Sequence, residues 1–354
     1  MGFIPRLLVV VPLFVPLCSV SVAAPQARPQ AKDEIVTFEA PDGGTAAGQG
    51  TVARSISPSG EITGEFYDSN EAVHGFVRAA DGTIATLDVP GASTANGQGT
   101  FPRSINPAGE IAGFYNDASH LTTRGFVRDS YGSITTFDGL PMSINPRGQT
   151  TGTDSAGHGF VRDSDGTITK FDAGPIGTFP QSISPSGEVT GYYADLSFIP
   201  HGFVRDSDGE ITTFTMGPNT PTFPTSINPK GEITGFYSDS SAMTHGFVRE
   251  KGGKITSFDA GPLDTTATSI SPGGAITGYY FDANKLAQGF MRVGKADIET
   301  FEVPGAGGPF FGDGTVPKSI NPGREVTGSY TDAIGSYHGF LRMPNHDKES
   351  SKVN

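Results

Sequence analysis

Residues 226–259 read SINPKGEITGFYSDSSAMTHGFVREKGGKITSFD, and this stretch decides the fold. Together with Thr225 just before it, the stretch forms four short segments of the β-branched and aromatic residues that strands favour: Thr225–Asn228, Glu232–Tyr237, His245–Arg249 and Lys254–Asp259. Asn-Pro-Lys-Gly, the residue order of a tight type I turn, joins the first two segments, and another short link with glycine joins the last two. The stretch therefore predicts a four-stranded antiparallel meander, whose strands we call A to D.

The same unit occurs seven times along the chain. The copies lie 39 to 50 residues apart, and each carries the turn proline and an arginine at the end of strand C. Repeats of this length with four strands each are typical of β-propeller blades. The first serine of each copy stands at Ser55, Ser104, Ser143, Ser182, Ser226, Ser269 and Ser319.

Strand D follows each of the first six copies, but the seventh runs from Arg342 into a polar tail. Ahead of the first copy lies an unmatched strand D, Glu34–Glu39, with the sequence EIVTFE. Placed on the outer edge of the last blade, this strand completes seven blades and leaves no unpaired edge. We predict an all-β fold, a seven-bladed β-propeller closed by the N-terminal strand in the last blade.

The ends of the chain have a different composition. Residues 1–24 have the basic, apolar and small-residue order of a signal peptide, 25–33 are a linker, 34–343 the propeller and 344–354 a disordered tail. Cys18 raises a lipoprotein alternative, but Leu17 stands where a small residue is usual. The signal peptide predicts a secreted protein, periplasmic or extracellular. Cys18, the one cysteine, would leave with the signal peptide, so we expect the mature protein to be stable without disulfides.

The formal net charge of −13 bears on partners. An acidic protein repels phosphate backbones, so we expect no nucleic-acid partner. The apolar segment at the start is too short for a membrane span. We also expect a monomer with no cofactor.

The recurring Ser-Ile-Asn-Pro-x-Gly, Gly-x-Tyr-x-Asp and His-Gly-Phe-Val-Arg motifs resemble a bacterial extracellular repeat family known for a His-Ala-Phe (HAF) motif. Here glycine stands where that family usually has alanine. The likeness covers roughly residues 34 to 342. It implies a secreted, propeller-like protein, and it implies no particular chemistry.

An aspartate after strand B and a histidine at the start of strand C recur in most copies. Such a pair could bind a metal or form an acid–base pair. A catalytic site is needed only once, so we predict that the pairs brace the B–C loop by hydrogen bonds and hold no metal. The predicted braces are Asp68 and His74, Asp117 with Arg124 in the histidine position, His158, Asp195 and His201, Asp239 and His245, and Asp332 and His338.

Two other recurring features have both a structural and a functional interpretation. The seven strand-C arginines are too alike to grip a single carboxylate, so we expect them to stack or form ion pairs between blades. The C–D turns Asp163–Gly166 and Asp206–Gly209 suggest a calcium loop or a sialidase Asp-box. They lack the further ligands of the first and the spacing of the second, so we interpret them as hairpin turns.

The departures from the repeat fall on the D–A links. Those leading into the first, second and seventh copies are long and share a Gly-x-Gly-Thr sequence, and ring closure makes these copies neighbours. Glycine allows backbone amides to approach a ligand, and amide and aromatic side chains could bind a glycan or a protein. The alternative is that the loops only cover the closure seam. The candidate binding residues are Gln49, Asn96, Gln98, Phe310, Phe311 and Asp313.

Two functions remain open at this point. The first is an exported, non-catalytic binding or scaffold propeller with its ligand on the rim that carries the long D–A loops. The second is a carbohydrate-active hydrolase or lyase using groups such as Asp68, Tyr67 and His74 near the central channel. No copy shows clearly unique acidic or basic residues at its B–C loop, which favours the binding protein.

Overall fold

The computed structural model describes residues 33–119, 122–295, 297–310 and 312–345. Asp33–Pro344 form one compact unit. Its regular structure is made of β-strands, and the described residues contain no helix, so the all-β prediction is confirmed. The predicted signal peptide at 1–24, residues 25–32 of the predicted linker and residues 346–354 of the predicted tail lie outside the described residues.

Five sheets correspond to the second through sixth repeats. Each contains four strands that follow one another in sequence and pair antiparallel. The first three of these sheets consist of β6 (Thr100–Ile105), β7 (Ile111–Asp117), β8 (Thr122–Arg128) and β9 (Ile134–Phe137); β10 (Leu140–Ile144), β11 (Thr150–Thr153), β12 (Gly159–Arg162) and β13 (Ile168–Phe171); and β14 (Ile176–Ile183), β15 (Val189–Ala194), β16 (Pro200–Arg205) and β17 (Ile211–Phe214). The other two consist of β18 (Thr222–Ile227), β19 (Ile233–Ser238), β20 (Thr244–Arg249) and β21 (Ile255–Phe258); and β22 (Leu263–Ile270), β23 (Ile276–Phe281), β24 (Ala287–Val293) and β25 (Asp297–Phe301).

The first and seventh repeats share one eight-stranded, mixed sheet. The single parallel pair Gly50↔Tyr337 joins its two halves. At the other edge of β28, β1 pairs antiparallel, with Ile35 opposite Arg342 and Phe38 opposite Gly339. The strands are β1 (Glu34–Phe38), β2 (Gly50–Ile56), β3 (Ile62–Tyr67), β4 (Val73–Arg78), β5 (Ile84–Leu87), β26 (Thr315–Ile320), β27 (Val326–Thr331) and β28 (Tyr337–Met343).

The four strands predicted in the fifth repeat are all present, but the first begins earlier than expected. β18 starts at Thr222 rather than Thr225, so that Pro224 lies within it, opposite Gly235. Proline cannot donate a hydrogen bond to a neighbouring strand, which confines it to the edges of sheets. Pro224 is tolerated because β18 pairs with only one strand, β19.

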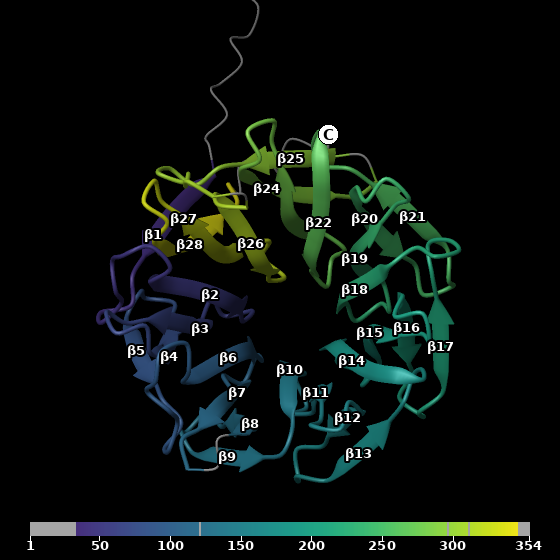
Figure 1. The fold of residues 1–354 in the computed structure, drawn as a ribbon, viewed down its shortest axis with the longest axis horizontal. Helices are drawn as coiled ribbons and strands as arrows, with labels where there is room; N and C mark the ends of the chain where they lie inside the picture. Colours follow the sequence, from purple (N-terminus) through teal and green to yellow (C-terminus); the bar gives the residue numbers. More distant parts are fainter. Residues whose placement is uncertain (1–32, 120–121, 296, 311, 346–354) are drawn as a thin grey trace, which may run out of the picture. The chain divides into compact units, whose positions relative to one another are not determined.

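Figure 1 shows the sheets of this unit arranged around a common centre, with β2, β6, β10, β14, β18, β22 and β26 nearest to it. Hydrogen bonds link these inner strands between repeats, for example from the Ile105 amide to the Ser55 hydroxyl at 3.2 Å. The same bond joins the first repeat to the last, from the Ile56 amide to the Ser319 hydroxyl at 3.4 Å. The Asn321 side-chain amide also donates to the Ser57 carbonyl at 3.2 Å.

The strand-C arginines pack between repeats, as the sequence predicted. Six guanidinium groups lie 4.7 to 5.2 Å from the ring centre of the strand-D phenylalanine of the preceding repeat. This stacking covers apolar surface with a cation and is attractive electrostatically. The stacked pairs are Arg78 on Phe38, Arg162 on Phe137, Arg205 on Phe171, Arg249 on Phe214, Arg292 on Phe258 and Arg342 on Phe301.

Candidate functional site

Most of the predicted Asp and His pairs come together in the structure. The Asp to His distances between carboxylate oxygen and imidazole nitrogen are 3.8 Å for Asp68 and His74, 3.0 Å for Asp195 and His201, 3.4 Å for Asp239 and His245, and 3.3 Å for Asp332 and His338. In the second repeat Arg124 lies 3.9 Å from Asp117. Each aspartate of the four histidine pairs also accepts backbone amides of its own B–C loop, as in an Asx turn. These bonds are those expected of a loop brace.

The third repeat departs from this arrangement. Asp154 accepts the backbone amide of His158, and its other oxygen lies 2.7 Å from the Lys170 ammonium. His158 instead bonds Asp172 at 2.7 Å. The shorter loop of this repeat places the two residues only four positions apart, which suits a bond from the backbone amide.

A second carboxylate, which the sequence analysis missed, lies on the other side of several of these histidines. His74 Nδ1 lies 2.8 Å from Asp88, His245 Nδ1 lies 2.7 Å from Asp259, and His338 bonds Glu39. These acids directly follow strand D in the sequence. Since β4 pairs with β5, and β28 with β1, the histidine at the start of strand C faces the end of strand D.

The paired histidines make stability depend on pH. Burial alone would lower the pKa of His245, but its bonds to Asp259 and Asp239 outweigh burial and raise the pKa; Glu39 and Asp332 do the same for His338. A raised pKa in the folded state contributes stability that is complete below about pH 6.5 and is lost as the pH rises through the folded-state value. The melting temperature should therefore fall between pH 5.5 and 7.5.

A double variant, His245→Gln with His338→Gln, should flatten this pH profile, because glutamine does not titrate. Gln288 occupies the same position in the sixth repeat, so the side chain suits the fold. Thermal melts of both proteins across this range test the expectation. Identical slopes in the two proteins would contradict it.

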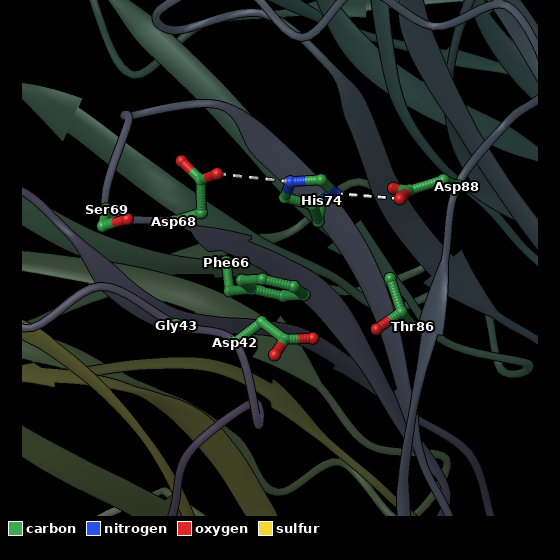
Figure 2. A pocket seen from close by; sticks show the side chains of 8 residues that line it. All are labelled: Asp42, Gly43, Phe66, Asp68, Ser69, His74, Thr86 and Asp88. Atoms are coloured by element: carbon green, nitrogen blue, oxygen red, sulfur yellow. Dashed lines mark hydrogen bonds and ion pairs between the residues drawn. The ribbon is translucent and has the colours of Figure 1, made fainter.

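The pocket in Figure 2 surrounds one of these histidines. It has a volume of about 560 Å³ and is lined in part by Asp42, Phe66, Asp68, His74 and Asp88. His74 stacks on Phe66, with ring centres 5.0 Å apart. Successive strand residues point to opposite faces, so Tyr67 of the proposed catalytic set lies on the other side of β3. The structure therefore does not bring Asp68, Tyr67 and His74 into one site.

The long D–A loops are bonded to the B–C loop of the preceding repeat. The Val73 amide donates to the Gln98 carbonyl at 2.9 Å, the Tyr337 amide to the Gln49 carbonyl at 2.7 Å and the Ala287 amide to the Asp313 carbonyl at 2.7 Å. Isolated parallel bridges, Val73↔Gly99 and Ala287↔Gly314, accompany two of these bonds. The sequence analysis expected these glycines to let backbone amides approach a ligand. In the structure, they allow the loop to approach a neighbouring backbone instead.

Three of the six candidate binding side chains on these loops, those of Gln49, Asn96 and Asp313, form bonds within the protein. Gln49, expected to contact a ligand, is 8% exposed, and its amide bonds the Ser69 carbonyl and the Ala46 amide. Asn96 bonds Glu71, and Asp313 accepts the Phe310 amide at 2.8 Å. Gln98 is exposed and the Phe310 ring is 65% exposed, whereas Phe311 lies outside the described residues. The Gln49 side chain is therefore a buried brace with little surface for a ligand.

The repeats also differ from one another on their inner strands. Every inner strand has a break in register directly before its repeat serine, which marks a β-bulge. A bulge inserts one residue and redirects its side chain. The bulged residues are Arg54, Arg103, Met142, Gln181, Thr225, Thr268 and Lys318 in chain order, so the three cations fall in the first, second and seventh repeats.

Glu65 on β3 lies among these cations and is fully buried. Arg54 donates to it through Nε at 2.8 Å, and Arg103 Nη1 lies 3.4 Å from both of its oxygens. Burial would raise the pKa of Glu65, but Arg54 and Arg103 outweigh burial and lower it. The equivalent positions hold Phe114, Thr153, Tyr192, Phe236, Tyr279 and Ser329, so Glu65 is the charged exception. We call Arg54, Glu65, Arg103 and Lys318 the charged cluster.

Lys318 is half-buried, and burial, together with the positive charges of Arg54 and Arg103, lowers its pKa to about 8. Arg103 lies over two stacked rings, 4.8 Å from the Phe114 ring centre and 5.7 Å from that of Phe101. Burial raises the pKa of Tyr67, and the negative charge of the nearby Glu65 carboxylate adds to this rise. The cluster thus combines two guanidinium groups and an ammonium group with a half-buried aromatic surface.

Within the described residues, no group of three or more His, Cys, Asp or Glu side chains could hold a metal ion. No helix in that part of the chain is long and apolar enough to cross a membrane. The C–D turns considered as calcium loops close on themselves, with the Asp206 carboxylate accepting the amides of Asp208 and Glu210.

No protein-family model and no curated protein matches the sequence. The fold is similar to that of a streptogramin B lyase, with a TM-score of 0.59 and 14% identity over 88% of this chain and 98% of the other. A catalytically inactive virginiamycin B lyase from Staphylococcus aureus, solved with quinupristin, gives a TM-score of 0.58 at 13% identity, over 88% and 100% of the two chains. A puromycin hydrolase gives 0.51 at 13% identity, over 81% of this chain and 50% of that one. At these identities the likeness shows a shared propeller fold alone.

Proposed function

We propose that the chain forms a closed ring of seven four-stranded blades and is an exported, non-catalytic binding protein. Its ligand contacts the blades of the seventh, first and second repeats. One observation carries the proposal: the charged cluster and the long D–A loops, the main departures from the repeat, fall on these three consecutive repeats. A repeat protein reuses one scaffold, so function belongs to the positions where copies differ.

Seven blades follow from dividing the eight-stranded sheet at Gly50↔Tyr337. That single parallel pair has the same place in the repeat as the bridges Val73↔Gly99 and Ala287↔Gly314, which link neighbouring separate sheets. β1 then supplies the outer strand of the last blade. The bonds from Ile56 to Ser319 and from Asn321 to Ser57 support the same closure. Export is supported by the composition of residues 1–24 and by the resemblance to the HAF-type repeat family.

The second candidate is a carbohydrate-active hydrolase or lyase at the pocket of Figure 2, where His74 lies between Asp68 and Asp88. The same arrangement surrounds His245 and His338, which supports a bracing role over a reaction in one repeat. A hydrolase or lyase function at this pocket is therefore the weaker candidate.

A glycan array probed with the protein, run with an assay of reducing-sugar release, separates the two functions. Binding without release of sugar supports the binding protein. Gln98→Ala tests whether the exposed loop residue takes part in that binding, and it should leave the fold intact because this side chain is exposed. Release of sugar that is lost in Asp68→Ala would support the enzyme and contradict our proposal.

A further inference from the structure

The inner face of three neighbouring blades has more positive charge than the protein around it can balance. The chain as a whole carries a formal charge of −13, yet Arg54 and Arg103 pair with one buried carboxylate, Glu65, and the Lys318 ammonium lies near them without an ion pair of its own. Keeping like charges together away from water costs free energy unless counter-charges are present. The bulges of the other four repeats hold neutral residues, so the fold itself does not require cations there.

Donor groups of the cluster remain available. Arg103 contacts Glu65 only through long Nη1 bonds of 3.4 Å, and part of its side chain is exposed. For the Lys318 ammonium, the described part of the chain provides no hydrogen bond and no ion pair. A buried or half-buried cationic donor without a partner is costly, and an anionic group of a ligand would satisfy it.

We propose that the inner face of β26, β2 and β6 binds the acidic group of a saccharide, either the carboxylate of a uronic acid or a sulfate. Lys318 and the exposed part of the Arg103 guanidinium contact the acidic group, while Glu65 holds the guanidinium groups of Arg54 and Arg103 in place. The half-buried rings of Phe101 and Phe114 provide the apolar surface on which a sugar ring stacks. This inference rests on the proposed binding function and names its ligand class.

Binding of such an anion should be linked to protonation of Lys318. The pKa of this side chain is lowered to about 8, so a fraction of the amine is uncharged in mildly alkaline solution. An anion binds the charged form and therefore raises the pKa, which means that binding takes up protons. The affinity should fall as the pH rises from 7 to 9.

Isothermal titration calorimetry at fixed ionic strength tests the site with trigalacturonate, its fully methyl-esterified form and a sulfated trisaccharide. Lys318→Thr removes one cation without leaving Glu65 unpaired, and Thr225 and Thr268 show that threonine fits this bulge. We expect one of the two acidic probes to bind, with at least tenfold weaker binding in Lys318→Thr. The matched control Gln181→Thr, at the same bulge of the fourth repeat, should bind as the original protein does.

The arms of the experiment have distinct meanings. Preference for trigalacturonate identifies a carboxylate site, and preference for the sulfated probe a sulfate site. Equal affinity for trigalacturonate and its ester, unchanged affinity in Lys318→Thr, or no binding of either acidic probe would overturn the inference. The proposed binding function would survive those results if the glycan array still gave a ligand, and would fail with the inference if it gave none.

Discussion

Glu65→Ala is expected to reduce the free energy of unfolding by about 3–5 kcal/mol, the usual cost of breaking a buried ion pair from one side. The side chain is fully buried, and both Arg54 and Arg103 bond it. Its removal leaves three neighbouring cations with no carboxylate among them. Equilibrium unfolding in urea measures the loss.

A rescue experiment separates charge from packing. Glu65→Phe with Arg54→Thr gives this blade the residues found in the fifth repeat, Phe236 on strand B and Thr225 at the bulge. This double variant should recover most of the stability lost in Glu65→Ala, because the phenylalanine ring fills the space that alanine leaves empty and Arg54→Thr removes one unpaired cation. A loss below about 1 kcal/mol in Glu65→Ala would show that the cations are solvated and do not depend on Glu65.

Removing β1 is expected to have an effect of similar size. The Phe38 ring makes an edge contact with Phe76, with ring centres 6.1 Å apart, and lies under the Arg78 guanidinium. Truncation of such a phenylalanine typically costs about 3–5 kcal/mol. Arg342, which is 1% exposed, would also lose its ion pair with Asp33. In addition, the outer edge of β28 would become free to pair with another chain.

A chain that begins at residue 40 should therefore unfold at least about 3 kcal/mol more easily than one that begins at residue 25, and it should self-associate. Urea unfolding and light scattering measure the two effects. A chain that begins at residue 33 keeps β1 and is the control, which should behave as the longer chain does. Equal stability of the chains that begin at residues 33 and 40 would show that β1 contributes nothing to the last blade.

Much of the architecture could be predicted because the repeat encodes it locally. Each turn proline and glycine marks a hairpin, and the alternation of Ile, Phe and polar residues sets the register of strands B, C and D. The six strand-D segments and the arginine stacking could be predicted for this reason. Strand A was predicted too short, since it also includes Pro224, which an edge strand tolerates.

The candidate site was predicted less well, for a physical reason. Comparison of the B–C loops found no unique charge, but the unique charges lie on strands, at the residue before the repeat serine and the residue after the strand-B glycine. Aligning those two positions would have identified Arg54, Glu65, Arg103 and Lys318. The sequence does not show that a bulge redirects the side chain at the first of these positions. It also does not show that the Gln49 side chain bonds the Ser69 carbonyl of the B–C loop.

In the proposed closed ring, the last repeat meets the first, which brings Lys318 beside Arg54, and β1 completes the last blade. Glu34 and Met343 are partners in the β1–β28 register, and Glu34 is exposed while Met343 is half-buried. The variant Glu34→Cys, Met343→Cys, with Cys18 replaced by serine, places two cysteines across this pair. After mild oxidation, peptide mapping under non-reducing conditions should recover residues 34 and 343 in one disulfide-linked fragment of a monomeric protein, with a raised melting temperature. Free thiols at both positions, or a disulfide found only between chains, would contradict closure and with it a single site shared by three blades.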